Sequence, residues 1–501
     1  MKINRKAVGA VLLLAVGGAV LLFTERGPVD WTDKDEITIV LTREGFRPQE
    51  VYIHAGTKVT FVSERDGQFW PASDLHPFHT IYKEFDPRRP LDQSEQWSVV
   101  LDKEGHWSYH DHIDPITTGA LIVVPPGVRA DARYDVIAEC TQDDLGGRQA
   151  CWKLQIQFAL QKKGLDAAFE KVGEIYTAHE DFRRDCHLYV HDLGLLAYQR
   201  YGDTPPLTER MATCGQGFFH GYLEGLLSYH KGNVSVASTF CSRVGVRFKE
   251  TFPLAGPQCY HGIGHGQMEY IFSTRPDLMN ALSDLVGLGI SDCGLLSDDD
   301  SKFRCASGAY AVTKDWINIQ SLRKEYPEFF SLDDVYALCR HVSDGWATRA
   351  CAWEFSKQAY ITANKSSDLA LQKLIASGRE WKPEYLDLMV TSMAFLVGEL
   401  GVSKSDTELV HECDTARMEG LGVPCIAGIE NGLLFNGKPE AQETERSVQF
   451  CNATELTSAE KTACTDILVR YMSGAYGAEG LRTVCVTVPD MPVCMPQDHQ
   501  M

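Results

Sequence analysis

One stretch of the sequence reads Cys259-Tyr-His-Gly-Ile-Gly-His265-Gly-Gln-Met-Glu269, and it repeats the pattern of Cys214-Gly-Gln-Gly-Phe-Phe-His220-Gly-Tyr-Leu-Glu224. Both copies read C-x2-G-x2-H-G-x2-E. In an α-helix a histidine and a glutamate four residues later project from the same face. Each copy is therefore predicted to be a helix that offers one imidazole and one carboxylate to the same region of space.

A third pair with the same spacing follows Cys186 directly, and it adds two more imidazoles. Imidazole and carboxylate donors in this number suit zinc, iron, copper or manganese. The candidate metal ligands of this part of the chain are His187, His191, His220, Glu224, His265 and Glu269. Six candidates exceed four tetrahedral positions, so we expect either that some only support other ligands or that two metals bind. His261 is set aside because it lies two residues after Cys259, near the expected hairpin turn.

The element C-x2-G recurs later in the chain without the ligands. It is present at Cys305 to Gly308 and at Cys425 to Gly428, where the histidine position holds Ala311 and Asn431. This pattern indicates a degenerate internal repeat, in which cysteine staples a helical hairpin and glycine lets a neighbouring helix come close. In such a repeat the cysteines and glycines form the scaffold in every copy, and only the first copies carry candidate metal ligands.

Apolar residues follow a 3.6-residue period over 152–160, 168–176 and 386–397, which is typical of amphipathic helices. We therefore expect an all-α, disulfide-stapled domain of helical hairpins over residues 151–501. Residues 126–150 are expected to form a linker that contains the first disulfide.

All sixteen cysteines lie between Cys140 and Cys494. An even number in a chain that carries an export signal indicates disulfides formed in an oxidising compartment. The repeated spacing C-x11-C favours pairing in sequence order. The expected pairs are Cys140/Cys151, Cys186/Cys214, Cys241/Cys259, Cys293/Cys305, Cys339/Cys351, Cys413/Cys425, Cys451/Cys464 and Cys485/Cys494.

Residues 1–26 resemble a signal anchor. Basic residues precede an uncharged apolar run from Ala7 to Phe23, which lies at the short limit for a membrane-spanning helix. The basic flank predicts a cytoplasmic N-terminus, with the rest of the chain on the extracytoplasmic face, in the periplasm or at the cell exterior. We expect a retained membrane anchor, whereas cleavage at one of the small-residue sites would give a secreted protein.

Residues 35–125 show short runs of alternating apolar residues separated by turns, which predict a small all-β sandwich. The order within it is F-x-P, then V-x-I-x-A-G-x-x-V-x-F over 51–61, a histidine-bearing loop, G-x-W-x-Y over 105–109, and a closing apolar strand over 119–124. This order resembles the cupredoxin family. In that family a histidine after the mid-domain loop is a copper ligand, and His79 matches it.

The chain departs from the cupredoxin pattern at the remaining ligands. Tyr109 is followed by His110-Asp-His112, without the family's cysteine or methionine. The intense blue chemistry needs a copper–thiolate bond, so we expect no type-1 site. The histidines that remain are candidates for an all-imidazole copper site: His76, His79, His110 and His112. Asp111 is expected to point away from them, because neighbouring residues of a strand face opposite sides.

Three functions remain open. The first is a membrane-tethered extracytoplasmic metal-binding protein, with copper in the sandwich, a second transition metal such as zinc, iron or copper in the helical domain, and a redox or copper-handling role with a redox or metal-transfer partner. The second is an enzyme whose helical centre activates water, with Glu224 or Glu269 as base. The third is a structural envelope protein with incidental histidines. The net charge of −20 argues against a nucleic-acid partner.

Overall fold

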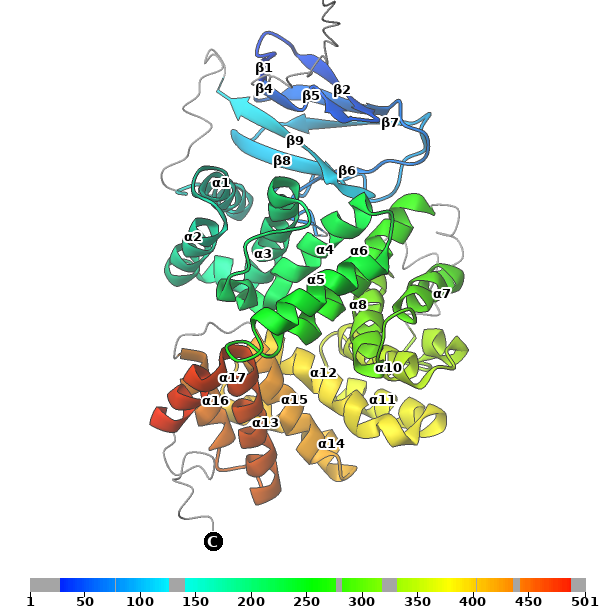
Figure 1. Cartoon of the computed structure of the whole chain (residues 1–501), viewed down its shortest axis with the longest axis vertical. Coiled ribbons are helices and arrows are strands. Elements are labelled where there is room, and N and C mark those ends of the chain that lie inside the picture. The colour runs from blue at the N-terminus through cyan, green and yellow to red at the C-terminus, as the bar shows by residue number, and fades with distance from the viewer. Residues whose placement is uncertain are drawn as a thin grey trace, which may run out of the picture.

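The computed structural model describes residues 28–76, 78–125, 140–275, 282–317, 331–401, 403–435 and 442–487. A β part comes first, and a larger helical part follows it (Figure 1). The division agrees with the expected all-β and all-α domains. The expected membrane segment and most of the expected linker lie outside the described residues.

The strands of the β part form two mixed sheets. The order in the first sheet is β1 (Val29–Asp30), β4 (Glu50–His54), β9 (Asp114–Val124), β8 (Gly105–Asp111) and β6 (Pro71–Ser73). The order in the second sheet is β3 (Gly45–Arg47), β2 (Glu36–Thr42), β5 (Thr57–Ser63) and β7 (Gln96–Leu101). Strand β2 runs parallel to β5 and β4 runs parallel to β9, while β8 pairs antiparallel with β9.

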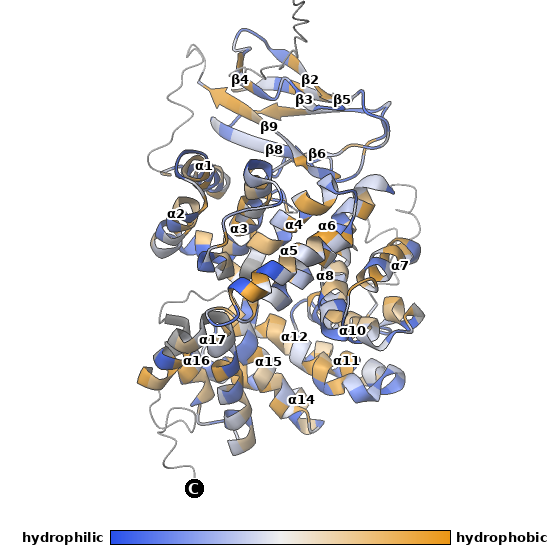
Figure 2. Cartoon of the chain, in the orientation of Figure 1, coloured by the Kyte–Doolittle hydropathy of each residue, from blue (hydrophilic) through white to orange (hydrophobic). Residues whose placement is uncertain are grey.

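Aromatic side chains fill the space between the two sheets. Tyr109 of β8 packs edge-on against Phe46 of β3 and Phe61 of β5, with ring centroids 4.9 and 5.3 Å apart. Burial of each such ring contributes about 1.5–3 kcal/mol. Strand β9 is strongly apolar along its second half (Figure 2), and Leu121 and Val123 are fully buried. The alternation read from the sequence therefore marks the true core positions.

The described residues of the helical part are mostly α-helical. The first are α1 (Leu145–Lys163), α2 (Leu165–Ala178), α3 (Glu180–Tyr201), α4 (Gly217–Tyr229), α5 (Val234–Arg247), α6 (Ala255–Thr274), α7 (Leu282–Cys293) and α8 (Asp299–Ile317). The later ones are α10 (Gly345–Thr362), α11 (Ser367–Trp381), α12 (Leu386–Leu400), α13 (Asp406–His411), α14 (Asp414–Met418), α15 (Gly422–Phe435), α16 (Gln442–Cys451) and α17 (Ser458–Thr487). Short 3-10 turns lie at Glu209–Ala212, Cys214–Gln216, Ala337–His341 and Pro383–Tyr385.

Helix α1 begins inside the stretch expected to be linker. Asp144 caps it by accepting a hydrogen bond of 2.9 Å from the backbone N–H of Gly147. An aspartate at the N-cap satisfies a backbone donor that would otherwise be unpaired. The helix therefore starts several residues before Cys151, where the apolar period becomes visible in the sequence.

Helices α3, α4, α6, α8, α10, α12, α15 and α17 pack one against the next in that order (Figure 1). Glycines of the repeat lie where these helices touch. A Cβ atom on Gly221 would lie 1.9 Å from the backbone oxygen of His191, and one on Gly308 would lie 2.0 Å from that of His261. Only glycine allows so close an approach, which confirms the packing role predicted for it.

Seven of the eight expected disulfides are present, and each joins cysteines that are neighbours in sequence order. They are Cys140–Cys151, Cys186–Cys214, Cys241–Cys259, Cys293–Cys305, Cys339–Cys351, Cys413–Cys425 and Cys451–Cys464. Cys494 of the eighth expected pair lies outside the described residues. Disulfides of this density are typical of an oxidising, extracytoplasmic environment. Within the described ranges, no helix combines the length and apolar character that crossing a membrane requires.

The disulfide of Cys351 lies outside the C-x2-G repeat. Cys351 lies in α10 and is bonded to Cys339 in the preceding 3-10 turn, with the two Cα atoms 5.7 Å apart. The pairing itself is as predicted, but Glu354 stands three residues after Cys351, at the position where the C-x2-G element has glycine. Cys351 is therefore not a further copy of the C-x2-G element, which the sequence has at Cys214, Cys259, Cys305 and Cys425. A disulfide can hold the hairpin without that glycine, because the bond joins helix to turn and does not depend on how near the next helix lies.

Strands β8, β9 and β6 of the first sheet lie nearest the helical part, whereas β1, β4 and the second sheet lie farther from it (Figure 1). Buried charges connect the two parts. Lys153 of α1 forms ion pairs with Asp74, which follows β6, and with Asp192 of α3 at 2.9 Å. The end of the sandwich that carries the histidines is thereby fixed against α1 and α3.

Candidate metal centres

The four candidate histidines of the sandwich form one buried group. One ring nitrogen from each of His76, His79, His110 and His112 lies within 4.8 Å of the others. His76 and His79 belong to the loop after β6, His110 lies on β8, and His112 follows the end of that strand. All four side chains are at most 7% exposed.

The spacing of the facing nitrogens matches a shared ion. Nε2 of His79 lies 2.9 Å from Nδ1 of His112, and Nδ1 of His76 lies 3.2 Å from Nε2 of His110. Two donors each bound at about 2.0–2.1 Å to one ion lie about 2.9–3.4 Å apart for right or tetrahedral angles. The spacing within these two pairs is therefore that of ligands sharing one metal ion.

Carboxylates hold the outer nitrogens of two of these rings. Nδ1 of His79 lies 2.8 Å from Asp86, and Nδ1 of His110 lies 2.6 Å from Asp74. A ring N–H donated to a carboxylate fixes the tautomer and leaves the opposite nitrogen with a free lone pair. The nitrogens left free, Nε2 of His79 and Nε2 of His110, are the ones that face the other imidazoles.

The backbone at His79 is strained. Its φ angle is +52°, a left-handed conformation that is uncommon for a residue with a side chain. The hydrogen bond from its N–H to the oxygen of Leu75 (2.8 Å) and that from the Ser73 hydroxyl to its oxygen (3.2 Å) maintain this conformation. Strain of this kind concentrates at functional sites because it orients a side chain.

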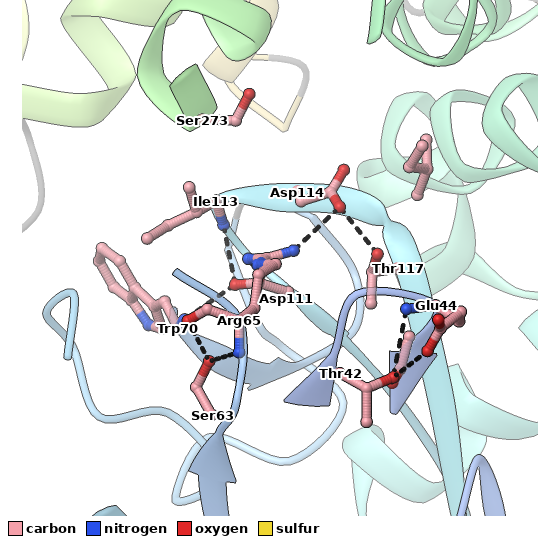
Figure 3. A network of polar contacts seen from close by, with 12 residues as sticks. Thr42, Glu44, Ser63, Arg65, Trp70, Asp111, Ile113, Asp114, Thr117 and Ser273 are labelled. Atoms are coloured by element: carbon pink, nitrogen blue, oxygen red, sulfur yellow. Dashed lines mark hydrogen bonds and ion pairs between the residues drawn. The ribbon is translucent and has the colours of Figure 1, made fainter. Parts of the chain in front are cut away.

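Asp111 lies between two candidate ligands and faces the other way, as predicted. Figure 3 shows its carboxylate paired with Arg65 and accepting hydrogen bonds from the backbone N–H groups of Trp70 (2.8 Å) and Ile113 (3.3 Å). Arg65 also pairs with Asp114 at 3.2 Å. This network fixes the turn from β8 to β9, so it holds His112 in place although strand β8 has already ended.

The surroundings keep two of these imidazoles neutral. Burial lowers the pKa of His110 to about 4, although the nearby Asp74 carboxylate opposes the shift. Burial and the neighbouring histidines hold the pKa of His112 well below its ordinary value. Neutral imidazole is the form that binds metal.

The candidate ligands of the helical part lie on three helices that pack side by side, α3, α4 and α6. Two groups of donors converge there: His220, His261 and His265 in one, and His191, Glu224 and His265 in the other. The rings of His220 and His265 stack with centroids 4.0 Å apart, and His191 Nε2 lies 2.9 Å from Glu224. Because both groups include His265, the two are contiguous.

His187 lies at the edge of these groups. Its Nδ1 lies 3.1 Å from the backbone oxygen of Cys214, and its ring centroid lies 5.0 Å from that of His220. Burial lowers the pKa of His187 and of His261 to about 4 and holds that of His220 and of His265 well below the ordinary value. These imidazoles are therefore also neutral.

The two sets of ligands meet where the sandwich contacts the helices. Nε2 of His76 lies 3.5 Å from Oε1 of Glu269 on α6, and its ring stacks on that of His191 with centroids 6.0 Å apart. Burial lowers the pKa of His76, but the Glu269 carboxylate outweighs it and the net shift is upward. Burial raises the pKa of Glu269.

All ten predicted ligands thus lie within one continuous region, although sequence reasoning missed several of its residues. His261 joins the group on α6 because that helix begins at Ala255, so no hairpin turn intervenes. Its spacing to His265 was the available signal. Asp74, Asp86 and Lys153 were missed because a single charged residue in a loop or helix carries no pattern.

One further group of donors is not a metal site. Glu430 lies near Cys451 and Cys464, but these two cysteines are bonded to each other. A disulfide has no thiolate to offer.

Comparison of the chain with protein-family models, with curated proteins and with solved structures finds no match.

Proposed function

We propose that this chain is an extracytoplasmic copper protein with a redox or copper-handling role. The observation that carries the proposal is the convergence of four buried imidazoles whose facing nitrogens lie 2.9 and 3.2 Å apart. Incidental histidines on a surface do not converge in this way, and buried polar groups without a ligand are costly.

Copper is favoured by the chemistry of the donors and by the resemblance of the sandwich to cupredoxins. An all-nitrogen set suits Cu(II) in a tetragonal arrangement, and the absence of a thiolate predicts a type-2 site without strong visible absorption. A bound copper ion would supply one-electron redox chemistry. The protein's own part is to keep the imidazoles neutral, to orient them through Asp74 and Asp86, and to exclude water.

The helical groups support a second metal centre, for which zinc, iron and copper are all suitable on donor type. The disulfides favour an oxidising compartment, in which the N-terminal segment would tether the protein to a membrane. A redox or metal-transfer partner would then meet the protein outside the cytoplasm.

The alternative of a water-activating enzyme is favoured by one observation. Burial raises the pKa of Glu269, a carboxylate beside several imidazoles, and a carboxylate with a raised pKa can serve as a general base near neutral pH. Metal analysis separates the two proposals, because copper in the purified protein favours the first and zinc or manganese alone favours the second.

The test of the copper site is a titration of the metal-free, disulfide-bonded chain with Cu(II), followed by electron paramagnetic resonance. We expect a type-2 signal that the His79→Gln variant loses. In Asp86→Asn the affinity should fall about 10–100-fold, because this carboxylate orients the His79 ring. His230→Gln is the matched control, since His230 pairs with Asp203 and belongs to none of the groups of candidate ligands. The absence of a copper signal in the unmodified chain would refute the proposal.

A further inference from the structure

The ring of His76 is in contact with both sets of ligands. Its Nδ1 lies 3.2 Å from Nε2 of His110 in the sandwich, and its Nε2 lies 3.5 Å from Oε1 of Glu269 in the helical part. Among the candidate ligands of the described residues, His76 is the one that has one ring nitrogen beside a sandwich ligand and the other beside a helical ligand.

Both partners of His76 are acceptors. His110 presents a lone pair at Nε2 because its Nδ1–H is donated to Asp74, and Glu269 presents a carboxylate oxygen. An imidazole satisfies two acceptors either as a doubly protonated cation or with a metal ion in place of each proton. The second arrangement is an imidazolate that binds one ion through each nitrogen.

The side of His76 that faces the helices has the donors that another ion needs. Glu224 and Glu269 are 4% and 6% exposed, and their Oε2 atoms have no hydrogen-bond partner among the described residues. His191 holds the other oxygen of Glu224 at 2.9 Å. Two carboxylates this deeply buried repel each other, so each raises the free energy of the metal-free state. A cation between them would remove that cost.

We propose that His76 bridges two metal ions across the boundary between the sandwich and the helical part. The first ion is held by the four histidines of the sandwich, and the second by Nε2 of His76 and the Glu269 carboxylate. The pair of His191 and Glu224 lies beside this second ion. The inference rests on the proposed copper site and adds a second site that shares one of its ligands. When the second ion binds, the proton remaining on His76 leaves to solvent, so the ring carries one negative charge between two cations.

The arrangement explains why the sandwich site is covered. A bridge requires that the donors of the two parts keep a fixed separation, and the buried ion pairs of Lys153 with Asp74 and Asp192 fix that separation. Asp74 also holds His110, so the same carboxylate orients one ligand of the first ion and fixes the sandwich against α1 and α3.

The test uses the full, metal-free chain titrated with Cu(II), with total bound copper and the number of paramagnetic spins measured at each step. Two Cu(II) ions joined by an imidazolate are antiferromagnetically coupled, so their signals cancel at low temperature. We expect spins to equal copper at low loading, and then to fall short of total copper by two per chain once both sites fill.

The Glu269→Gln variant keeps the shape of the side chain and removes its charge. We expect its spin count to equal its bound copper at every loading, with circular dichroism unchanged. Glu430→Gln, which alters a buried glutamate on α15, is the matched control and should behave as the unmodified chain. Equal spins and copper in the unmodified chain would overturn the bridge, as would coupling that persists in Glu269→Gln. If the chain binds no copper at all, the proposed function fails first, and the two failures are thus distinguishable.

Discussion

The helical part uses one scaffold in two ways. Helices α4 and α6 carry histidines and glutamates that converge, and Glu269 of α6 reaches His76 of the sandwich. By contrast, α8, α10 and α15 hold Ala311, Lys357 and Asn431 at the position equivalent to His220 and His265. The close contacts made by glycine continue through both halves, since a Cβ on Gly432 would lie 2.0 Å from the oxygen of Phe395. Disulfides and glycines therefore hold the row of packed helices together. The other residues of each copy of the repeat determine whether that copy can bind metal.

The later half replaces the ligands with buried ion pairs. Glu354 is 1% exposed, its oxygens lie 3.0–3.1 Å from the amino group of Lys357, and Lys314 lies 3.6 Å away. Burial alone would raise the pKa of Glu354, but the two lysines outweigh it and lower the pKa to about 2. Charge is thus balanced within this half by the protein itself, whereas the carboxylates of the first half depend on histidines and, in our proposal, on metal.

The largest expected effect comes from breaking that balance. Glu354→Gln removes the ion-pair partner that Lys357 and Lys314 share, although Lys314 keeps its pair with Asp315 at 3.9 Å. We expect the free energy of unfolding to fall by about 3–5 kcal/mol. Chemical denaturation in urea measures the loss. The double variant Glu354→Gln with Lys357→Met should recover part of it, because one of the uncompensated charges is removed. A double variant no more stable than Glu354→Gln would contradict the ion-pair explanation.

The next effect tests the shared scaffold. Gly398→Ala places a Cβ 2.1 Å from the backbone oxygen of Ile429, between α12 and α15, which carry none of the candidate ligands. We expect a loss of about 1–3 kcal/mol, because two helices must separate. Gly221→Ala should cost a similar amount, and it should also weaken metal binding because the displaced backbone carries His191. Gly287→Ala in α7 is the control: nothing lies within 4 Å of its Cβ, so stability should be unchanged or slightly increased.

The scaffold variant Gly398→Ala and Gly221→Ala are compared by urea unfolding and by metal titration of the same samples. Equal losses of stability with unequal changes in metal affinity would confirm that scaffold and ligands are separable. A normal metal affinity in Gly221→Ala would show that the ligands tolerate helix displacement.

The scaffold was largely predictable from the sequence, since its signals are local. The cysteine spacing predicted the disulfides, and alternating residues such as Val59 and Phe61 predicted the strands. The meeting of His76 with Glu269 was not predictable, because it depends on how the sandwich packs on α3 and α6, and no local pattern encodes that packing. The charged residues that fix it, on α1 and after β6, are single residues without periodicity.

The last prediction concerns pH and the buried carboxylate of Glu430, which is not one of the candidate metal ligands and forms no ion pair with a lysine among the described residues. Burial raises the pKa of Glu430 to about 8, opposed by Ser447 and Arg446. In the unfolded chain this glutamate loses its proton near pH 4.5, but in the folded chain it keeps the proton until about pH 8. The unfolded state therefore binds fewer protons over that interval, so stability falls as pH rises from about 4.5 to about 8.

Glu430→Gln removes the ionisable proton, so we expect a smaller loss of stability between pH 5 and pH 8 than in the unmodified chain. Urea midpoints at the two pH values measure the difference, and Glu384→Gln, an exposed glutamate, serves as the control. If stability changes with pH in both variants as it does in the unmodified chain, then Glu430 ionises at its ordinary pH. Burial alone would then not be enough to raise the pKa of a glutamate in this fold. If only Glu430→Gln flattens the slope, a buried glutamate in this scaffold stays protonated unless positive charge lies beside it. Burial also acts to raise the pKa of Glu224, but His191 outweighs it and the net shift is downward, so the ionised state of Glu224 then follows from its neighbours.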